Sequence, residues 1–217
     1  MSAVVSYNRM LMNLKEKVMK LYLIRHGETN LNQKGVYYGW TDVPLCSKGE
    51  KQIKQLRNIF PQKAWDCIIS SPLQRAIQTV KLLQLPSNIP WVMEERLKEI
   101  HFGQWEGKRY ETIQKEDPIH WKRWINHWQV VAPPKGESYL ELYSRVESWL
   151  LECVEKHKNQ EILVISHQGC LRIILSILLG LGKEGYWHFS FESGAYSFVE
   201  YKDRHCIIHK MNQTPMP

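Results

Sequence analysis

The chain has 217 residues, of which 43% are hydrophobic and 24% charged, a composition typical of a folded domain that excludes a disordered chain. Its 29 lysines and arginines against 22 aspartates and glutamates give a net charge of +7. This balance favours an anionic partner, whether a nucleic acid, a membrane surface or a phosphorylated small molecule.

Residues 1–18 precede the first strand-like run and stand apart from the alternating strands and helices predicted for the rest of the chain. Met10, Met12 and Met19 are all candidate translation starts, and Met19 runs directly into an apolar segment. We expect Met19 or Met12 to be the natural start, with the earlier residues as a loose extension. The alternative is a genuine N-terminal helix.

Three short runs, at residues 21–24, 67–69 and 162–165, are continuously apolar. Continuous runs of this length are typical of strands buried on both faces of a parallel sheet. A helix signal follows each run, so strands and helices are expected to alternate along the chain.

Capping residues locate the first two of these helices. Ser47-x-x-Glu50 is a capping box, and Ser71 with Pro72 fits an N-cap followed by the first helical position. The predicted helices cover residues 47–60, 71–83 and about 169 to the glycines at 180–182.

Residues 103–135 interrupt the alternation, and they contain four of the nine tryptophans as well as a Pro-Pro break. We interpret them as a mostly helical insertion. After them, the capping box Ser138-x-x-Glu141 begins another predicted helix. The remaining predicted elements are that helix over 138–156, hairpin strands at 196–201 and 206–209, and a tail over 212–217.

These elements predict an α/β fold, a three-layer α/β/α sandwich with a mainly parallel central sheet, formed by one domain over residues 19–211. Ligands of such sheets bind beyond the carboxyl ends of the strands. Arg25 and His26 follow the first apolar run, Arg75 lies one helical turn after the second, and His167 follows the third. Two arginines and two histidines are therefore expected at one edge of the sheet.

This set of side chains is suited to a phosphoryl group. Guanidinium forks match phosphate oxygens, and the N-termini of the helices add N–H groups and positive dipole ends. A neutral histidine among them can act as a nucleophile, and the nearby positive charge lowers its pKa in that direction. Each residue alone is compatible with an ordinary polar position, but their convergence indicates a phosphoryl site.

The segment Leu23-Ile24-Arg25-His26-Gly27-Glu28-Thr29 resembles the signature of the histidine phosphatase superfamily, which includes the cofactor-dependent phosphoglycerate mutases. The resemblance extends from about residue 19 to residue 201, and the chain is identified as a member of this family. Further matching positions are Asn32, Gly39-Trp40, Leu45, Ser47-Lys48-Gly49, the segment 70–76, Leu97-Lys98-Glu99, Phe102-Gly103, Trp105-Glu106-Gly107, Gly136-Glu137-Ser138 and Ser166-His167.

The resemblance implies a role for each matching residue. His26 is implied to take the phosphoryl group as a phosphohistidine. Glu99 is implied to protonate the leaving oxygen and then to help activate water. The family needs no metal, and no cofactor is expected. The residues implied to bind the phosphoryl oxygens are Arg25, Arg75, His167, Asn32 and, through its backbone, Gln168.

Some residues near the predicted site have no catalytic role in this interpretation. Glu28 belongs to the signature without an assigned step, and Arg172 is expected to order the loop. Cys170 is interpreted as a buried, inert thiol.

Within the superfamily, residues 102–188 are most similar to the alpha-ribazole phosphatases of cobalamin biosynthesis. This implies hydrolysis of alpha-ribazole 5′-phosphate, or of the 5′-phosphate of the completed cobamide. The alternatives are a phosphoglycerate mutase, a broad-specificity phosphatase and a non-catalytic phosphate-binding module. The segment between Glu99 and His167 lacks the arginine-rich insertion of the mutases. Tyr38 replaces the usual Ser or Thr, which leaves the exact substrate open.

Trp121, Trp124 and Trp128 are spaced to share one face of a helix. This face either packs the insertion onto the core or walls a pocket for a flat aromatic substrate.

Five cysteines without a CxxC pair, and no apolar signal core near the N-terminus, indicate a reduced protein in the cytoplasm. The longest strongly apolar stretch, residues 173–181, is far shorter than the roughly 20 residues that span a bilayer. The expected partner is therefore a phosphorylated small molecule, with no nucleic acid and no membrane, and the oligomeric state is left open.

Overall fold

The computed structural model describes residues 18–215, and its centre is a six-stranded sheet with the order β3-β2-β4-β1-β5-β6. The strands are β1 (Met19–Arg25), β2 (Cys67–Ser70), β3 (Trp91–Met93), β4 (Glu161–Ser166), β5 (Tyr196–Lys202) and β6 (His205–Gln213). The strands β3, β2, β4 and β1 run parallel to one another, and the β5–β6 hairpin adds to β1 antiparallel. The prediction of a mainly parallel sheet is confirmed.

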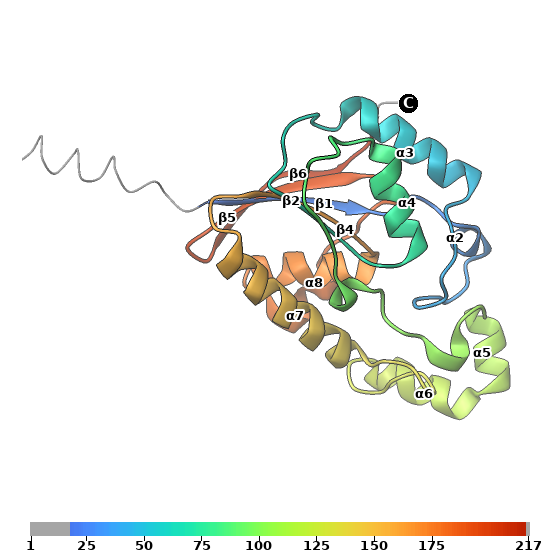
Figure 1. Cartoon of the computed structure of the whole chain (residues 1–217). Helices are drawn as coiled ribbons and strands as arrows, with labels where there is room; N and C mark the ends of the chain where they lie inside the picture. The colour runs from blue at the N-terminus through green and yellow to red at the C-terminus, as the bar shows by residue number, and fades with distance from the viewer. Residues whose placement is uncertain (1–17, 216–217) are drawn as a thin grey trace, which may run out of the picture.

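Helices cover both faces of this sheet, so the three-layer sandwich is also confirmed (Figure 1). The helices α3 (Ser47–Ile59) and α4 (Gln74–Leu83) lie on one face, and α7 (Tyr139–Lys156) and α8 (Gln168–Leu178) lie on the other. The remaining helical segments are α2 (Asn30–Lys34), α5 (Tyr110–Glu116), α6 (Pro118–His127) and the 3-10 turns Glu95–Leu97, Gly103–Trp105 and Gly182–His188.

The apolar run of β1 is continuous because each face of the strand meets a helical layer. Leu21 and Leu23 are buried in the cluster that includes α7 and α8, whereas Tyr22 and Ile24 are buried in the cluster that includes α3 and α4. Side chains alternate between the faces of a strand, so two apolar layers require apolar residues at successive positions. The loops beyond Arg25 and Ser166 thus start from a rigid edge.

Two predicted N-caps, Ser47 and Ser71, were wrong. The helix α3 has Cys46 as its N-cap, with no side-chain capping bond, and Ser47 is already helical. Similarly, α4 begins at Gln74 after the N-cap Leu73, later than expected. By contrast, Ser138 and Glu141 form the predicted capping box at the start of α7.

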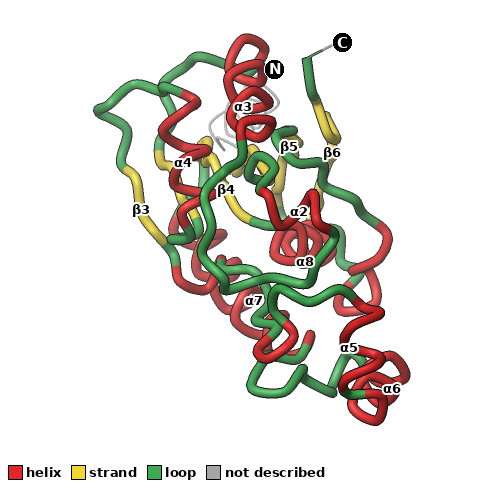
Figure 2. The backbone as a smooth tube through the Cα atoms, turned by 90° about the vertical axis from the view of Figure 1, so that its right-hand side faces the viewer, coloured by secondary structure: helices red, strands yellow, loops and turns green. Residues whose placement is uncertain are grey.

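The predicted insertion is mostly helical, as expected. In Figures 1 and 2, α5 and α6 form a pair that extends beyond the sheet layers. This pair has its own small core, in which Trp105, Ile113 and Trp121 are buried. The insertion therefore has an apolar cluster of its own beside the carboxyl edge of the sheet, and Tyr37 and Phe102 pack against it.

The strand β6 continues to Gln213, so it includes two residues of the segment predicted as a tail. The predicted extension over residues 1–18 lies almost wholly outside the described residues. Between residues 18 and 215, no helix is long and apolar enough to cross a membrane.

Candidate active site

The carboxyl edge of the sheet holds the predicted cluster. Arg25 and His26 at the end of β1, Arg75 in the first turn of α4 and His167 before α8 all line one cavity of about 210 Å³. Asn32, Glu99 and Gln168 line the same cavity. The structure therefore brings together every residue predicted for the site.

His26 is buried, with 3% of its surface exposed, and its hydrogen bonding fixes its tautomer. Its Nδ1 lies 2.7 Å from the carbonyl oxygen of Gly27, which can only accept, so Nδ1 carries the proton and Nε2 keeps a lone pair. Burial, together with the charges of Arg75 and Arg25, lowers the pKa of His26 well below its ordinary value. A neutral imidazole with a free Nε2 is the form in which a histidine is nucleophilic.

The backbone at Gly27 must approach the start of α3 closely. A Cβ on Gly27 would lie 2.6 Å from the carbonyl oxygen of Gly49, a distance that no side chain tolerates. Its N–H also donates to Thr79 Oγ1 at 3.3 Å. The glycine therefore lets the loop after β1 pack tightly, and this packing fixes the carbonyl that orients His26.

Arg25 is held at one end of its guanidinium and free at the other. Its Nη1 donates to Gln168 Oε1 at 2.5 Å and to the carbonyl oxygen of Phe191 at 2.8 Å. Its Nε is buried, and no atom of residues 18–215 accepts from it. Such a group costs free energy unless it gains a partner, so this edge of Arg25 is suited to a phosphoryl oxygen.

Arg75 is 1% exposed and anchored at three points. Its Nη2 and Nη1 donate to the carbonyl oxygens of Gly39 at 2.6 Å and Thr41 at 3.1 Å, and its Nε donates to His167 Nδ1 at 3.3 Å. Two of its five N–H groups remain for a ligand. Burial lowers the pKa of Arg75 and of Arg25, but guanidinium groups start so high that both stay charged at neutral pH.

His167 has both ring nitrogens engaged by protein atoms. Because Arg75 Nε donates to Nδ1, the proton must be on Nε2, which lies 2.8 Å from Ser71 Oγ. Burial and the charge of Arg75 lower the pKa of His167 well below its ordinary value. In this arrangement the neutral ring of His167 orients Arg75, and the predicted direct bond to a phosphoryl oxygen stays a prediction.

Asn32 is oriented by its neighbours so that its amide nitrogen is the available donor. Its Oδ1 accepts from the backbone N–H of Thr29 at 3.0 Å and from Tyr38 Oη at 2.8 Å. With the oxygen saturated, Nδ2 is the free end of the amide. Tyr38, the residue that departs from the family pattern, thus supports the cavity, and its ring also lies 4.9 Å from the guanidinium carbon of Arg75.

Glu99 is held by two backbone donors. Its Oε1 accepts from the N–H of Ile100 at 3.0 Å, and its Oε2 accepts from the N–H of Gly169 at 3.1 Å. A Cβ on Gly169 would lie 2.3 Å from Glu99 Oε1. Glycine at position 169 therefore lets the carboxyl group lie against the first turn of α8.

Sequence reasoning missed the residues that hold these loops. Arg145, on α7, donates from Nη1 to the carbonyl oxygen of Lys98 at 2.7 Å and from Nη2 to that of Glu99 at 3.0 Å. It also forms an ion pair with Glu137, with Nε and Oε1 2.6 Å apart. Glu137 belonged to a matched motif and was a detectable signal, whereas Arg145 is one charged residue among several on an amphipathic helix.

A second missed support is Glu106, from the matched motif Trp105-Glu106-Gly107. Its carboxylate accepts from the backbone N–H of Trp40 at 2.8 Å and of Thr41 at 2.5 Å. These bonds lower the pKa of Glu106 although it is partly buried. They also hold the loop whose carbonyl oxygens anchor Arg75.

The predictions for the remaining nearby residues agree with the structure. Glu28 forms an ion pair with Lys48 at 2.8 Å and lies away from the cavity lining. Arg172 donates to the carbonyl oxygen of Phe189 at 2.7 Å and orders that loop, although it also lines the cavity. Cys170 is fully buried, and burial raises the pKa of its thiol to about 12.

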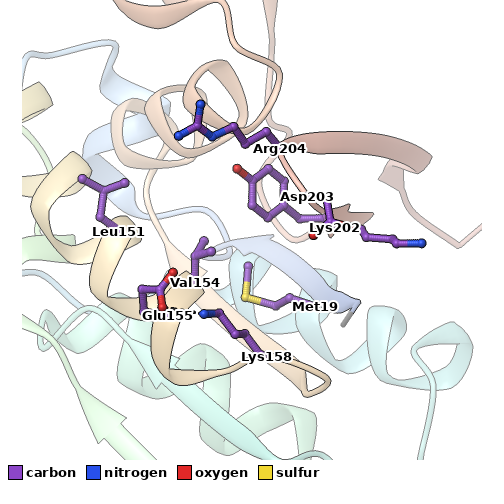
Figure 3. Close-up of a pocket in the computed structure, with 9 residues that line it drawn as sticks. Met19, Leu151, Val154, Glu155, Lys158, Lys202, Asp203 and Arg204 are labelled. Carbon is purple, nitrogen blue, oxygen red and sulfur yellow. Dashed lines mark hydrogen bonds and ion pairs between the residues drawn. The ribbon is translucent and has the colours of Figure 1, made fainter. Parts of the chain in front are cut away.

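A larger cavity, of about 500 Å³, lies at the opposite end of β1 and contains none of these groups (Figure 3). Met19, Val154 of α7 and Arg204 of the β5–β6 turn are among its lining residues. Its side chains include the ion pair of Lys158 with Glu155 at 2.5 Å. The site is therefore identified by the convergence of its side chains and not by cavity size.

The two buried neutral histidines predict a pH-dependent stability. Below about pH 6.5, the ordinary pKa of histidine, the unfolded chain takes up protons that folded His26 and His167 do not. The free energy of unfolding should then fall by about 1.4 kcal/mol per pH unit for each of them as the pH decreases. Denaturant unfolding at pH 7.5, 6.5 and 5.5 in phosphate-free buffer measures this slope.

Two variants show which histidine causes the change in the free energy of unfolding with pH. His167→Gln should remove about half of it, and His205→Gln, at an exposed position on β6, should leave it unchanged. Equal slopes in all three proteins would contradict the buried neutral state of His167.

A family model described as the histidine phosphatase superfamily (branch 1) matches residues 21–214. The chain therefore belongs to this superfamily, as its signature predicted, and is a phosphoric monoester hydrolase.

Several characterised relatives cover nearly the whole chain. The adenosylcobalamin/alpha-ribazole phosphatase of Escherichia coli (strain K12) is 32% identical over 89% of this chain and 96% of its own. Phosphoserine phosphatase 1 of Hydrogenobacter thermophilus is 33% identical over 91% of this chain and 93% of its own. The crystal structure of the alpha-ribazole phosphatase from Shigella flexneri matches with a TM-score of 0.85 and 32% identity, covering 90% of this chain and 96% of that one.

Proposed function

We propose that the protein hydrolyses phosphomonoesters through a phosphohistidine formed on His26. In the first step, Nε2 of His26 bonds to phosphorus and the ester P–O bond breaks. Glu99, in its acid form, gives its proton to the leaving alcohol oxygen. The observation that carries this proposal is the tautomer of His26: with Nδ1–H bonded to Gly27, the Nε2 lone pair is free.

In the second step, Glu99 takes a proton from a water molecule whose oxygen bonds to phosphorus. The N–P bond breaks, inorganic phosphate leaves, and His26 returns to its neutral form with the same Nδ1 proton. Glu99 regains the proton that it donated, so the cycle is balanced.

The cationic groups of the cavity act on the transferring phosphoryl group. Arg25 and Arg75 stabilise the negative charge of its equatorial oxygens, and Asn32 and the first N–H groups of α8 add hydrogen bonds. These donors are held by protein partners before a substrate binds, so little reorganisation accompanies the reaction. We include His167 in this set as a predicted ligand of the phosphoryl group.

For the substrate, we propose alpha-ribazole 5′-phosphate, or the 5′-phosphate of the completed cobamide. Support comes from the relatives of that name and from the tryptophan-rich insertion. Phosphoserine is the principal alternative, because a phosphoserine phosphatase is equally similar in sequence.

The test compares kcat/KM for alpha-ribazole 5′-phosphate, phosphoserine and 3-phosphoglycerate in buffer with a metal chelator. We expect the first substrate to exceed the other two by about 100-fold. A preference for phosphoserine would refute the proposed substrate, and formation of 2-phosphoglycerate would indicate a mutase. Phosphate binding without turnover of any ester would indicate the binding module.

We further propose that the enzyme acts in the cytoplasm on this small molecule, without a nucleic-acid partner. The cysteines of residues 18–215 are all free thiols, which agrees with a reducing compartment.

A further inference from the structure

A second cavity, of about 360 Å³, adjoins the phosphoryl cavity. Four residues line both of them: Tyr37, Ile100, Phe102 and Tyr186. The two cavities therefore adjoin along these side chains, and in the proposal below a ligand held by Arg25 and Arg75 extends from the first into the second.

The second cavity differs from the first in chemistry. Its outer walls include Trp124, Ile125, Trp128 and Trp187, and no charged side chain of the described residues lines it. Its tyrosine Tyr139 already donates to the carbonyl oxygen of Lys183 at 2.6 Å. The cavity thus offers aromatic faces and edges to a ligand. The guanidinium of Arg172 lies behind two of these rings, 4.9 Å from that of Trp187 and 5.3 Å from that of Tyr186.

Glu99 lies at the junction of the two cavities. The carboxyl group of Glu99 and the hydroxyl group of Tyr186 lie on the same side of Gly169. A Cβ at that position would be 2.3 Å from Glu99 Oε1 and 3.2 Å from Tyr186 Oη. The next residue after Glu99, Ile100, lines both cavities. In the proposed reaction the leaving oxygen takes its proton from Glu99. The carbon chain on that oxygen then runs past Ile100 and Tyr186 toward the second cavity.

The predicted tryptophan face is divided by the structure. Trp121 is buried beside Trp105, with ring centroids 5.7 Å apart, and belongs to the core of the insertion. Trp124 and Trp128 line the second cavity. Core packing therefore holds for Trp121, whereas Trp124 and Trp128 both line the pocket and pack against their neighbours. The ring of Trp124 lies 5.5 Å from those of Trp105 and Trp121, and Trp128 packs against the main core.

The geometry points to the second cavity as the binding site for an uncharged aromatic ring system carried by the leaving alcohol. This inference rests on the proposed phosphatase function, in which Glu99 protonates the leaving oxygen. It assigns Trp124, Ile125, Trp128 and Trp187 as specificity-determining residues. It also predicts that small esters such as phosphoserine are poorer substrates, since they carry no ring to fill this apolar cavity.

The test uses two synthetic phosphomonoesters, 2-(2-naphthyl)ethyl phosphate and ethyl phosphate, whose leaving alcohols have similar basicity. We expect kcat/KM for the naphthyl ester to be about 10- to 100-fold higher, the effect of burying a large apolar group. Phosphoserine should be turned over no faster than ethyl phosphate.

Three single variants test whether the preference for the naphthyl ester depends on the second cavity. Ile125→Ala and Trp187→Ala change side chains that are 50% and 63% exposed, so both variants should fold. Each should lower the ratio of the two kcat/KM values by about 3- to 10-fold. Ile119→Ala, on the same helix as Ile125 but 77% exposed and outside the cavity, is the matched control and should leave the ratio unchanged.

The possible results separate this inference from the proposed substrate. A ratio near one, or a ratio that neither cavity variant changes, overturns the inference even if alpha-ribazole 5′-phosphate is a good substrate. A preference for phosphoserine over the naphthyl ester also overturns it. A high ratio that falls in the variants supports it, and it does so even if alpha-ribazole 5′-phosphate itself is hydrolysed poorly.

Discussion

Replacing His26 with alanine is expected to lower kcat for para-nitrophenyl phosphate by about 10⁴-fold or more, because the variant has no nucleophile to accept the phosphoryl group. The native enzyme, mixed with ³²P-labelled substrate and quenched in alkali, should retain label as phosphohistidine. The His26→Ala protein should retain none. Steady-state turnover and the retained label together measure the effect.

The control is His205→Ala, which changes an exposed histidine on β6 and should keep full activity. Circular dichroism should show the same secondary structure in both variants. The side-chain hydrogen bond lost in His26→Ala is to the neighbouring residue Gly27 and does not join two secondary-structure elements. Substantial turnover by His26→Ala, or label retained on another residue, would rule out His26 as the nucleophile.

Replacing Glu99 with glutamine is expected to lower kcat/KM for ethyl phosphate by about 10²- to 10³-fold, and for para-nitrophenyl phosphate by less than about 10-fold. An alkoxide needs a proton to leave, whereas para-nitrophenolate is stable without one. The comparison uses kcat/KM because this quantity contains the steps up to release of the alcohol and excludes the later attack of water.

Two further variants test the position of the carboxyl group. Gly169→Ala should show a milder form of the same leaving-group dependence, because its Cβ would displace Glu99 Oε1 from a distance of 2.3 Å. Glu95→Gln changes a carboxylate paired with Lys98 near the surface and should affect neither ester. Equal losses on both esters in Glu99→Gln would remove Glu99 from the acid role.

The first principal prediction depends on the protonation state of His26, and the second depends on the position of the Glu99 carboxyl group. His26 is neutral because it is buried beside two guanidinium groups, and its proton is on Nδ1 because Gly27 offers only an acceptor. Glu99 is placed by the N–H groups of Ile100, in its own loop, and of Gly169, in the first turn of α8. The backbone therefore positions both the nucleophile and the acid, and side-chain substitutions in supporting residues should act mainly through these backbone contacts.

The sequence alone was sufficient to predict the layers of the fold and the residues that converge at the site. Short continuous apolar runs are typical of strands covered on both faces, so residues 21–24 and 162–165 indicated their place in a buried sheet. Parallel strands end at one edge, so Arg25, His26 and His167 were expected together before any distance was known. The superfamily signature added the chemical roles.

Only the tertiary structure decided where helices begin and which residues support the site. Ser71 does not cap α4, because the helix begins at Gln74 after the N-cap Leu73. Its Oγ instead accepts from the N–H of Leu73 at 3.3 Å and lies 2.8 Å from Nε2 of His167, a partner far along the chain. Arg145 holds the loop of Glu99 from a helix that lies far along the chain, and local sequence patterns do not predict such a contact. Likewise, the spacing of Trp121, Trp124 and Trp128 predicted a shared face but not which ring faces a cavity. Helical periodicity depends on neighbours in sequence, whereas capping choices, loop anchors and pocket walls depend on residues that only folding brings together.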